Sequence, residues 1–226
     1  MRGLLKTLGA ATAVVLLGLA ASHPASAQVR SEPPLVDDAG GLALESHGYR
    51  LWLPAPDWLD ASAQQSGAIR PQVNAVFRDA EREAVLEIYP GQETEALWNT
   101  LYGARLTIGT DLTLKSIRST VMAGFAGDCR RELTGFFQLS ADDGDNLGTL
   151  GMVCGAYDPR LSTIAGLGEI TVMSFHRDGN VVALVFQQWR GKAFTPSDPA
   201  TWPVPTKTVE TRARQLQAEP RLTRDD

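Results

Sequence analysis

Histidine is the side chain most often used for proton transfer and zinc binding near neutral pH, and it is scarce in this chain. Beyond residue 27 only His47 and His176 occur. Neither has the HxxH or HExxH spacing of a metal site, and zinc needs three or four ligands. A Ser–His–Asp triad would have to use one of these two, and the sequence holds no GxSxG motif. We therefore predict no catalytic residue and no cofactor.

Both histidines are expected to be structural. His176 stands one residue before the turn-forming stretch 177–180, which predicts a solvated hairpin tip. His47 precedes Gly48 at the start of a predicted strand. A hydrolase that uses carboxylates alone remains a further alternative, because Asp and Glu can supply both an acid and a base. Its candidates lie in and beside a predicted hairpin link, where a solvated face is expected: Asp79, Glu81, Glu83 and Glu87.

The densest group of oxygen ligands is the stretch 142–146, DDGDN, with Asp142, Asp143 and Asp145. Calcium takes six to eight oxygen ligands, which such a loop supplies in part. The D-x-D-x-D-G order of an EF-hand is not met. Asp, Gly and Asn are also the residues that tight turns select. We predict a hairpin loop and no metal site, with these three carboxylates as a weak metal-site alternative.

Two cysteines occur in the chain, Cys129 and Cys154. In an oxidising compartment a lone pair usually forms one structural disulfide, and the spacing excludes a CxxC redox motif. Closing a loop of about 26 residues should stabilise the fold by roughly 3–4 kcal/mol in the loop-entropy description. We predict a Cys129–Cys154 disulfide.

Five tryptophans are many for this length, and core packing is their default role. If two or three gathered at the surface, they would form an aromatic patch for a partner. Trp202, between prolines in a predicted loop, is expected to be partly exposed, and Trp58 follows a stiff Pro-Ala-Pro turn. We predict Trp58 and Trp202 as a possible interaction surface.

The first 27 residues have the order of a secretory signal peptide. Arg2 and Lys6 precede an apolar run from Leu8 to Ala21, and the stretch 25–27 is a small-x-small cleavage signal. The run is too short and too rich in small residues for a comfortable spanning helix. We expect a soluble protein, periplasmic or secreted, with no membrane insertion after cleavage.

Charge narrows the class of partner. Without Arg2 and Lys6 the chain keeps 19 basic against 26 acidic residues, a net charge of −7, and no run of five like charges. Nucleic acid and anionic lipid both need clustered Lys and Arg. We expect neither as a partner.

The predicted elements begin after a flexible lead-in at residues 28–41, which is rich in Pro and Gly. A single domain is expected at residues 42–218. Residues 49–53 alternate and end at Pro54, a pattern typical of a strand. Residues 73–77 and 84–89 predict a hairpin.

The second half of the chain predicts more strands and two helices. Leu97, Leu101, Ala104 and Ile108 recur at helical spacing, which predicts a helix from Glu93 to Ile108. Strands are expected at residues 112–122, 131–139, 147–157, 170–176 and 181–189, with a type I′ hairpin turn at Asp178-Gly179.

The chain is expected to close with a helix and a tail. Thr206 should cap a helix of about twelve residues that turns Val209, Ala213 and Leu216 inward. Residues 219–226 are expected to form a frayed tail.

Three stretches resemble the PsbP-like superfamily: Tyr49–Trp58 (YRLWLPAPDW), Ala75–Tyr89 (AVFRDAEREAVLEIY), and Ala123-Gly124 with the strands after it. The resemblance covers about 150 residues. It implies an α+β fold, an antiparallel sheet of about seven strands with helices packed on it. It implies no particular function, because members share the fold without sharing an activity.

These observations favour an exported, non-catalytic binding or accessory protein of the bacterial cell envelope. Its partner would be an unidentified envelope protein or a small ligand. A carrier of a small apolar ligand is the main alternative, with a pocket between helices and sheet. The carboxylate-only hydrolase is the third.

Overall fold

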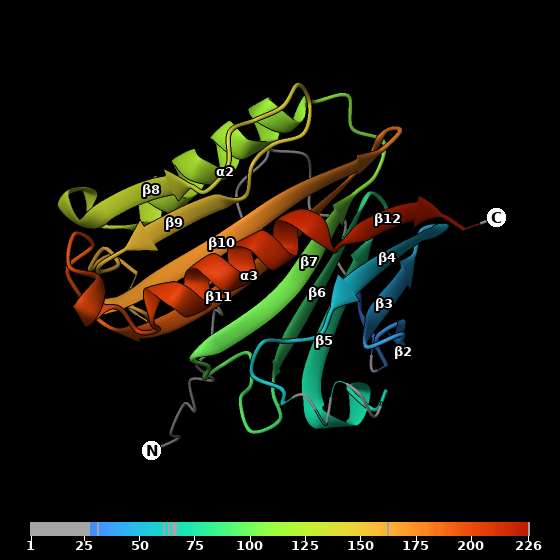
Figure 1. The fold of residues 1–226 in the computed structure, drawn as a ribbon, viewed down its shortest axis with the longest axis horizontal. Helices are drawn as coiled ribbons and strands as arrows, with labels where there is room; N and C mark the ends of the chain where they lie inside the picture. The colour runs from blue at the N-terminus through green and yellow to red at the C-terminus, as the bar shows by residue number, and fades with distance from the viewer. Residues whose placement is uncertain are drawn as a thin grey trace, which may run out of the picture.

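The computed structural model describes residues 28–30, 32–60, 62, 64, 67–161 and 163–225. The predicted signal peptide, residues 1–27, lies outside the described residues. The fold is α+β with antiparallel strands and helices packed on them, as the sequence predicts, but the described strands form two sheets, of eight and four strands, instead of one sheet of about seven (Figure 1).

The larger sheet has eight strands, and every neighbouring pair is antiparallel. Its spatial order is β1 (Gln28–Arg30), β5 (Val73–Ala80), β6 (Glu83–Pro90), β7 (Thr100–Thr107), β11 (Val181–Lys192), β10 (Leu167–Asp178), β9 (Leu150–Cys154) and β8 (Thr134–Gln138). The long strands β10 and β11 form its centre. Their run 181–186 is buried on both faces, as its continuous apolar sequence predicts.

The smaller sheet has four strands in the order β12 (Arg221–Arg224), β4 (Tyr49–Pro54), β3 (Gly41–Ser46) and β2 (Leu35–Asp38). Among the described residues, three short 3₁₀ helices lie in the links between helices and strands: η1 (Arg70–Gln72), η2 (Arg131–Leu133) and η3 (Pro199–Thr201).

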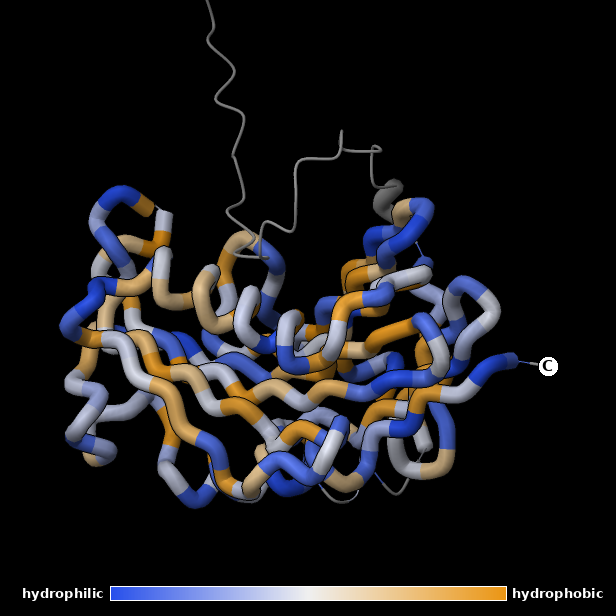
Figure 2. Tube along the Cα trace, turned by 90° about the horizontal axis from the view of Figure 1, so that it is seen from above, coloured by the Kyte–Doolittle hydropathy of each residue, from blue (hydrophilic) through white to orange (hydrophobic). Residues whose placement is uncertain are grey.

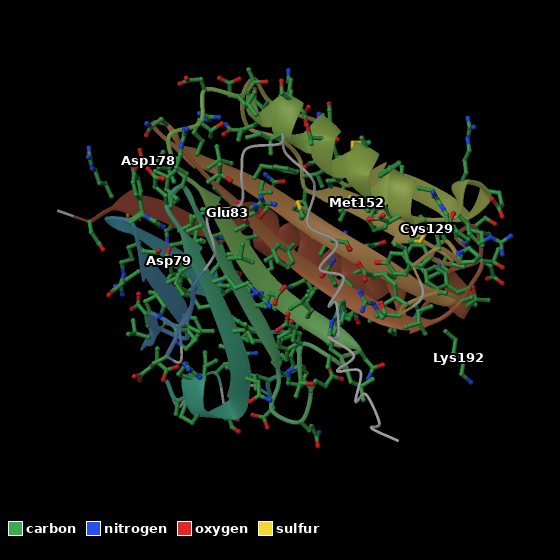
Figure 3. All side chains as sticks on the ribbon, turned by 180° about the vertical axis from the view of Figure 1, so that it is seen from behind. Asp79, Glu83, Cys129, Met152, Asp178 and Lys192 are labelled. Carbon is green, nitrogen blue, oxygen red and sulfur yellow. A yellow bond between two sulfur atoms is a disulfide. The ribbon has the colours of Figure 1, made fainter. Side chains whose placement is uncertain are left out.

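The two helices cover opposite faces of the larger sheet. Helix α3 (Thr206–Ala218) and the smaller sheet share one core with the face that carries Val172 of β10. Helix α2 (Leu114–Asp128) packs on the other face, with Met173 of the same strand. Figure 1 shows α3 in front of β10 and β11, and Figure 3, from behind, shows α2 in front. In Figure 2 the apolar stretches run along the strands, while outer turns are mostly hydrophilic.

The predicted helix from Glu93 to Ile108 is wrong, because most of this range forms strand β7. Its apolar residues serve both faces of the sheet: Tyr102 lies in the α3-side core and Leu101 in the α2-side core. Gly103 also fits a strand here, since the ring of Phe186 on β11 lies where its side chain would be.

The predicted strand at 112–122 is also wrong, because helix α2 begins at Leu114. The Thr113 side chain accepts a hydrogen bond from the backbone N–H of Ser116 and caps the helix. Ile117, Val121 and Phe125 follow at helical spacing on its buried side.

Both ends of the described chain form strands. The predicted flexible lead-in, residues 28–41, contains β1, which pairs with β5, and β2, which pairs with β3. The predicted frayed tail contains β12, which pairs with β4 from Arg221↔Trp52 to Arg224↔Tyr49. The β1–β5 and β12–β4 pairings join segments distant in sequence, which local composition cannot reveal, whereas β2 and β3 form a local hairpin.

Other expectations are confirmed with small shifts. The β5–β6 and β10–β11 hairpins are present. The second closes on Gly179-Asn180, because Asp178 pairs with Val181, and only Gly179 of the two has positive φ (55°). That is the pattern of a type II′ turn instead of the predicted type I′. Helix α3 buries Val209, Ala213 and Leu216, with Pro205 instead of Thr206 at its N-cap.

Candidate functional site

A pocket of about 280 Å³ lies where the link after β4, the start of β7, the end of β11 and the approach to α3 meet. Tryptophan rings and polar side chains share its wall. The lining residues are Asp57, Trp58, Asn99, Thr100, Trp189, Arg190, Pro203, Val204 and Thr208. We refer to it as the Trp58 pocket.

Prolines give the pocket two stiff walls. Pro54, Ala55 and Pro56 are buried behind the first wall, and the N–H of Leu59 donates to the carbonyl of Pro56, which turns the chain at Trp58. The second wall is the approach to α3, which holds Pro203. Because proline fixes φ, both walls lose little entropy when they order.

Two buried polar atoms of this wall have no hydrogen-bond partner: Asp57 Oδ1 and Trp58 Nε1. Burial raises the pKa of the Asp57 carboxyl, although the positive charge of Arg212 and hydrogen bonds from Trp189 and the backbone act to lower it. A buried acceptor and a buried donor left unpaired each cost free energy, so this wall is suited to a polar guest.

Arg190, near the end of β11, is held in place by an ion pair with Glu169. Its Nε and Nη2 atoms donate to Glu169 Oε2 at 3.1 and 2.8 Å. Its Cζ lies 3.6 Å from the centroid of the Trp98 ring, a cation–π contact. Glu169 also accepts hydrogen bonds from Thr171 and Gln188, at 3.0 and 2.8 Å. The Arg190 side chain is therefore held in one position at the pocket, and the carboxylate of Glu169 already neutralises its charge.

A second polar group lies beneath α3, next to the pocket. Arg212 is 1% exposed, and its Nη1 donates to the carbonyl of Ala55 at 2.9 Å and to Gln215 Oε1 at 2.6 Å. Its Cζ lies 4.2 Å from the centroid of the Tyr102 ring. Gln187 is the cross-strand partner of Tyr102 and is fully buried.

The two predicted tryptophans lie near each other in the fold, with different roles. Trp58 lines the pocket. Trp202 stacks on Phe137 with ring centroids 6.5 Å apart, and its Nε1 donates to the carbonyl of Pro196 at 3.2 Å. Trp202 is half-buried and directly precedes the pocket residues Pro203 and Val204, so it supports the wall.

Sequence reasoning missed the charged residues of this region: Asp57, Arg190 and Arg212. One signal was present, since Arg212 falls between Val209 and Ala213 on the inward side of a helix that the sequence predicts. A charged residue on an apolar helical stripe indicates a buried polar site. The sequence around Arg190 has no comparable pattern that would indicate a buried charged residue.

The acidic loop forms a turn whose first carboxylate is engaged. Asp142 accepts two hydrogen bonds from Arg118, both at 2.8 Å, and others from Gln138 and the N–H of Gly148. Hydrogen bonds from Arg118, Gly148 and Gln138 hold the pKa of the Asp142 carboxyl well below its usual range. Asp143 and Asn146 exchange backbone hydrogen bonds around Gly144 (φ 60°), as in a tight turn. Among the described residues no cluster of three metal-ligating side chains occurs, Asp142, Asp143 and Asp145 included.

The histidines lie apart from the pocket, each with its own partner. His47, in the β3–β4 turn, lies with Nε2 2.8 Å from Asp79 Oδ1. His176 Nε2 is 2.8 Å from Ser174 Oγ on β10. The predicted solvated tip is wrong for His176: its side chain is partly buried, and burial lowers its pKa to about 4, opposed by a backbone hydrogen bond with Leu216.

Of the four predicted hairpin acids, Glu81 is exposed as expected, whereas Glu83 and Glu87 are paired with arginines instead of lying free on a solvated face. Glu83 accepts from Arg105 at 2.6 Å, and Glu87, which is 4% exposed, accepts from Arg78 at 2.8 Å. The Trp58 pocket has a single acid among its lining residues, Asp57.

The predicted disulfide is present: Cys129 and Cys154 are bonded, with their Cα atoms 5.6 Å apart. Cys129 is the C-cap residue of α2, and Cys154 ends β9, so the bond fixes α2 to the sheet that it covers. Figure 3 shows Cys129 at the end of α2. A structural disulfide is typical of an oxidising, extracytoplasmic compartment.

No helix within the described ranges is long and apolar enough to cross a membrane. Comparisons of this chain with protein-family models, with curated proteins and with solved structures find no match. The resemblance to the PsbP-like superfamily therefore stays a prediction.

Proposed function

We propose that this chain is an exported, non-catalytic binding protein of the bacterial cell envelope, and that it binds through the Trp58 pocket. The observation that carries the proposal is the pocket wall, where two aromatic rings border a buried carboxylate oxygen and a buried indole N–H that lack partners. Binding sites combine such apolar surface with a few polar groups that fix orientation.

Two further observations support export to an extracytoplasmic compartment. The first 27 residues have the order of a secretory signal peptide. The Cys129–Cys154 disulfide fits an oxidising compartment such as the periplasm or the exterior. Both support a protein that works outside the cytoplasm.

The lining of the pocket favours a polar guest over an apolar one. Asp57, Asn99, Thr100, Arg190 and Thr208 supply polar groups, and the volume of about 280 Å³ is just below the roughly 300–1,000 Å³ of small-molecule pockets, which suits a small guest. The carrier alternative thus takes the form of a small polar ligand, and the hydrolase alternative lacks a second carboxylate in this pocket.

A protein partner is the second candidate, and one feature favours it. Leu97 is 78% exposed at the tip of the Thr94–Leu97 turn, two residues before the pocket residue Asn99. An exposed leucine on a loop beside a pocket suits a docking contact. A protein partner that covers the pocket mouth would contact both Leu97 and the pocket.

The test compares affinity-tagged wild-type protein with a pocket variant, Trp58→Ala, and a distant surface control, Leu112→Ser. Each is purified from the periplasm after mild crosslinking, and bound proteins and extracted small molecules are identified by mass spectrometry. We expect a reproducible partner or ligand with wild type and control and its loss from Trp58→Ala. Equal recovery from all three proteins, or recovery of the bare chain alone, would contradict the proposal.

A further inference from the structure

The wall of the Trp58 pocket combines two kinds of surface. Four lining residues carry hydroxyl, amide or carboxyl groups: Asp57, Asn99, Thr100 and Thr208. Four others supply apolar surface: Trp58, Trp189, Pro203 and Val204. A guest that fits both kinds of surface carries several hydrogen-bonding groups together with an apolar face.

Two neighbouring residues of this wall lack partners of opposite kinds. Asp57 Oδ1 has no donor and Trp58 Nε1 has no acceptor among the described residues. Both side chains line the pocket, and each residue as a whole is only partly buried. A hydroxyl group both donates and accepts, so the hydroxyls of a guest supply what each of the two atoms lacks. Such pairing removes the cost of a buried polar atom that is left unsatisfied.

The charges around the pocket are balanced in pairs. The positive charge of Arg212 acts on the Asp57 carboxyl, and the lining residue Arg190 forms an ion pair with Glu169 at 2.8 Å. A cationic guest would meet Arg190 as a like charge, and an anionic guest would meet Asp57 in the same way. A neutral guest meets neither repulsion.

The polar corner at the start of β7 is held in place by the protein itself. The N–H groups of Asn99 and Thr100 both donate to Glu93 Oε2 at 3.0 Å, and Asn99 Nδ2 donates to Glu93 Oε1 at 3.1 Å. The carbonyl of Asn99 accepts from the N–H of Arg190 at 2.7 Å. Because these bonds already order the corner, a guest that binds to it loses little affinity to the ordering of the wall.

The apolar part of the wall comes from two indoles. Trp189 is the cross-strand partner of Thr100, so an indole and a hydroxyl-bearing side chain are neighbours on one face of the sheet. Trp58 lines the pocket from the link after β4. Indole rings offer a large flat apolar surface. A pyranose ring suits this arrangement, because hydroxyls project around its rim and C–H groups cover its faces.

We propose that the Trp58 pocket binds a neutral sugar as a single pyranose unit. Its hydroxyls hydrogen-bond with Asp57 and with the indole N–H of Trp58, and the C–H face of its ring packs on the apolar wall. A volume of about 280 Å³ suits one such ring. This inference rests on the proposed function, because it names the ligand class of the same pocket.

The first test is isothermal titration of wild-type protein with the methyl α- and β-pyranosides of D-glucose, D-galactose and D-mannose. Concentrations up to about 50 mM cover millimolar dissociation constants. We expect at least one of these neutral glycosides to bind. Absence of binding by all six would overturn the inference.

Matched ligands test the neutral charge and the hydroxyls. The uronate and the 2-amino derivative of the sugar that binds each add one charge to the same ring, and cyclohexanol keeps a six-membered ring with one hydroxyl. We expect each of the three to bind at least about tenfold more weakly than the neutral glycoside. Equal binding of the charged sugars, or of cyclohexanol, would contradict the proposal.

Two pocket variants locate the contact. Trp58→Phe keeps an aromatic ring but removes the N–H donor, and Asp57→Ala removes the acceptor. Each should weaken binding of the glycoside at least about tenfold. Thermal unfolding verifies that each variant is folded, and if Trp58→Phe fails to fold, the Asp57→Ala result decides. Unchanged affinity in the folded variants would overturn the proposed contacts.

The matched controls lie away from the pocket. Trp52→Phe removes the indole N–H that donates to the carbonyl of Asp38 at 3.0 Å in the smaller sheet. Asp111→Ala removes an exposed carboxylate. Both should bind the glycoside as wild type does, and a loss equal to that of the pocket variants would show that the effect does not arise at the pocket.

Two further measurements distinguish the source of the sugar. Mass spectrometry of small molecules released from denatured wild-type protein detects a free sugar. Retention of the protein on isolated cell-wall glycan, reversed by the methyl glycoside that binds, detects a terminal unit of a polymer. Either result supports the inference.

The same experiments separate this inference from the function beneath it. If no glycoside binds, but a different molecule or a protein is captured through Trp58, the ligand class is overturned and the proposed function stands. If nothing is captured through Trp58 at all, both are overturned. A crystal structure with water alone beside Asp57 and Trp58 after a soak in the glycosides would also overturn the inference.

Discussion

Asp57 and His176 are titratable side chains whose charged forms the fold disfavours. Burial acts on both, raising the pKa of the Asp57 carboxyl and lowering that of the His176 imidazole. The consequences for stability are opposite in direction, because one group becomes charged as pH rises and the other as pH falls.

The native pKa of His176 should lie far below its usual value of about 6.5. Between pH 6.5 and about 4 the unfolded chain binds a proton that the native imidazole does not, so stability should fall with falling pH. The loss approaches about 3 kcal/mol below pH 4, at 1.36 kcal/mol per unit. A proton NMR titration of the His176 ring measures the midpoint, and a midpoint near 6.5 would contradict the prediction.

For Asp57 the sign is reversed. Its raised pKa means that the unfolded state loses its proton first, so this residue stabilises the fold less as pH rises above its usual value of 3.8. Replacing Asp57 with Asn should therefore raise the midpoint of urea unfolding at pH 7 and change it little at pH 3. Asp111→Asn, at an exposed position, is the control and should shift neither midpoint. A lower midpoint for Asp57→Asn at pH 7 would show that the carboxylate is stabilising.

For single residues, the sequence predicts a role where the partner is close in the chain or where there is no other candidate partner. The Cys129–Cys154 bond follows from there being two cysteines, and Trp58 follows from its proline turn. The proximity of Arg212 to Asp57 does not follow from the sequence, because about 155 residues separate them and only the packing of α3 brings them together.

The elements β7 and α2 show where periodicity misleads. In β7 the residues Leu101 and Ala104 are spaced as on a helix, yet they pack on opposite faces of a sheet. In α2, Thr and Ser residues lower helix propensity, but the Thr113 cap and the buried stripe from Leu114 to Phe125 decide the outcome. Tertiary packing overrides local preference in both cases.

Two glycines offer a matched comparison between these elements. In β7, a Cβ on Gly103 would meet the carbonyl oxygen of Leu86 at 2.3 Å and the Phe186 ring at 2.9 Å. In α2, Gly127 is exposed and a Cβ there meets nothing within 4 Å. Gly103→Ala should destabilise the fold by about 1–3 kcal/mol, as overpacking does. Gly127→Ala should stabilise it by about 0.5–1 kcal/mol.

Urea unfolding measures both changes under the same conditions. The prediction depends on the opposite signs, so two substitutions that shift the midpoint in the same direction would contradict it. A neutral Gly103→Ala would show that the Phe186 ring moves aside without cost.

For the whole molecule, the core on the α3 side depends on strands far apart in the chain. β4 lies between β3, its neighbour in sequence, and β12, which follows it by about 170 residues. The sequence predicts the individual strand at 49–53 but not its second partner, because an edge of four residues carries little composition signal. The same holds for β1, which lies at the edge beside β5.

Proline substitutions test the β12 pairing. Asp225 donates its N–H to the carbonyl of Gly48, and in an antiparallel ladder this alternation directs the N–H of Thr223 to Arg50 and that of Arg224 outward. Thr223→Pro should therefore lower stability by about 1–2 kcal/mol through the lost ladder bond, while Arg224→Pro should change it much less. Thermal unfolding compares the two, and equal effects would contradict the register.

The disulfide between α2 and β9 has a consequence for how the chain matures after the proposed export. With two cysteines in 226 residues, only one intramolecular pairing exists. Oxidation therefore cannot trap the molecule in a scrambled isomer, and the chain needs a thiol oxidant but no disulfide isomerase. Its yield in the periplasm should respond to loss of the oxidising enzyme and be indifferent to loss of the proofreading one.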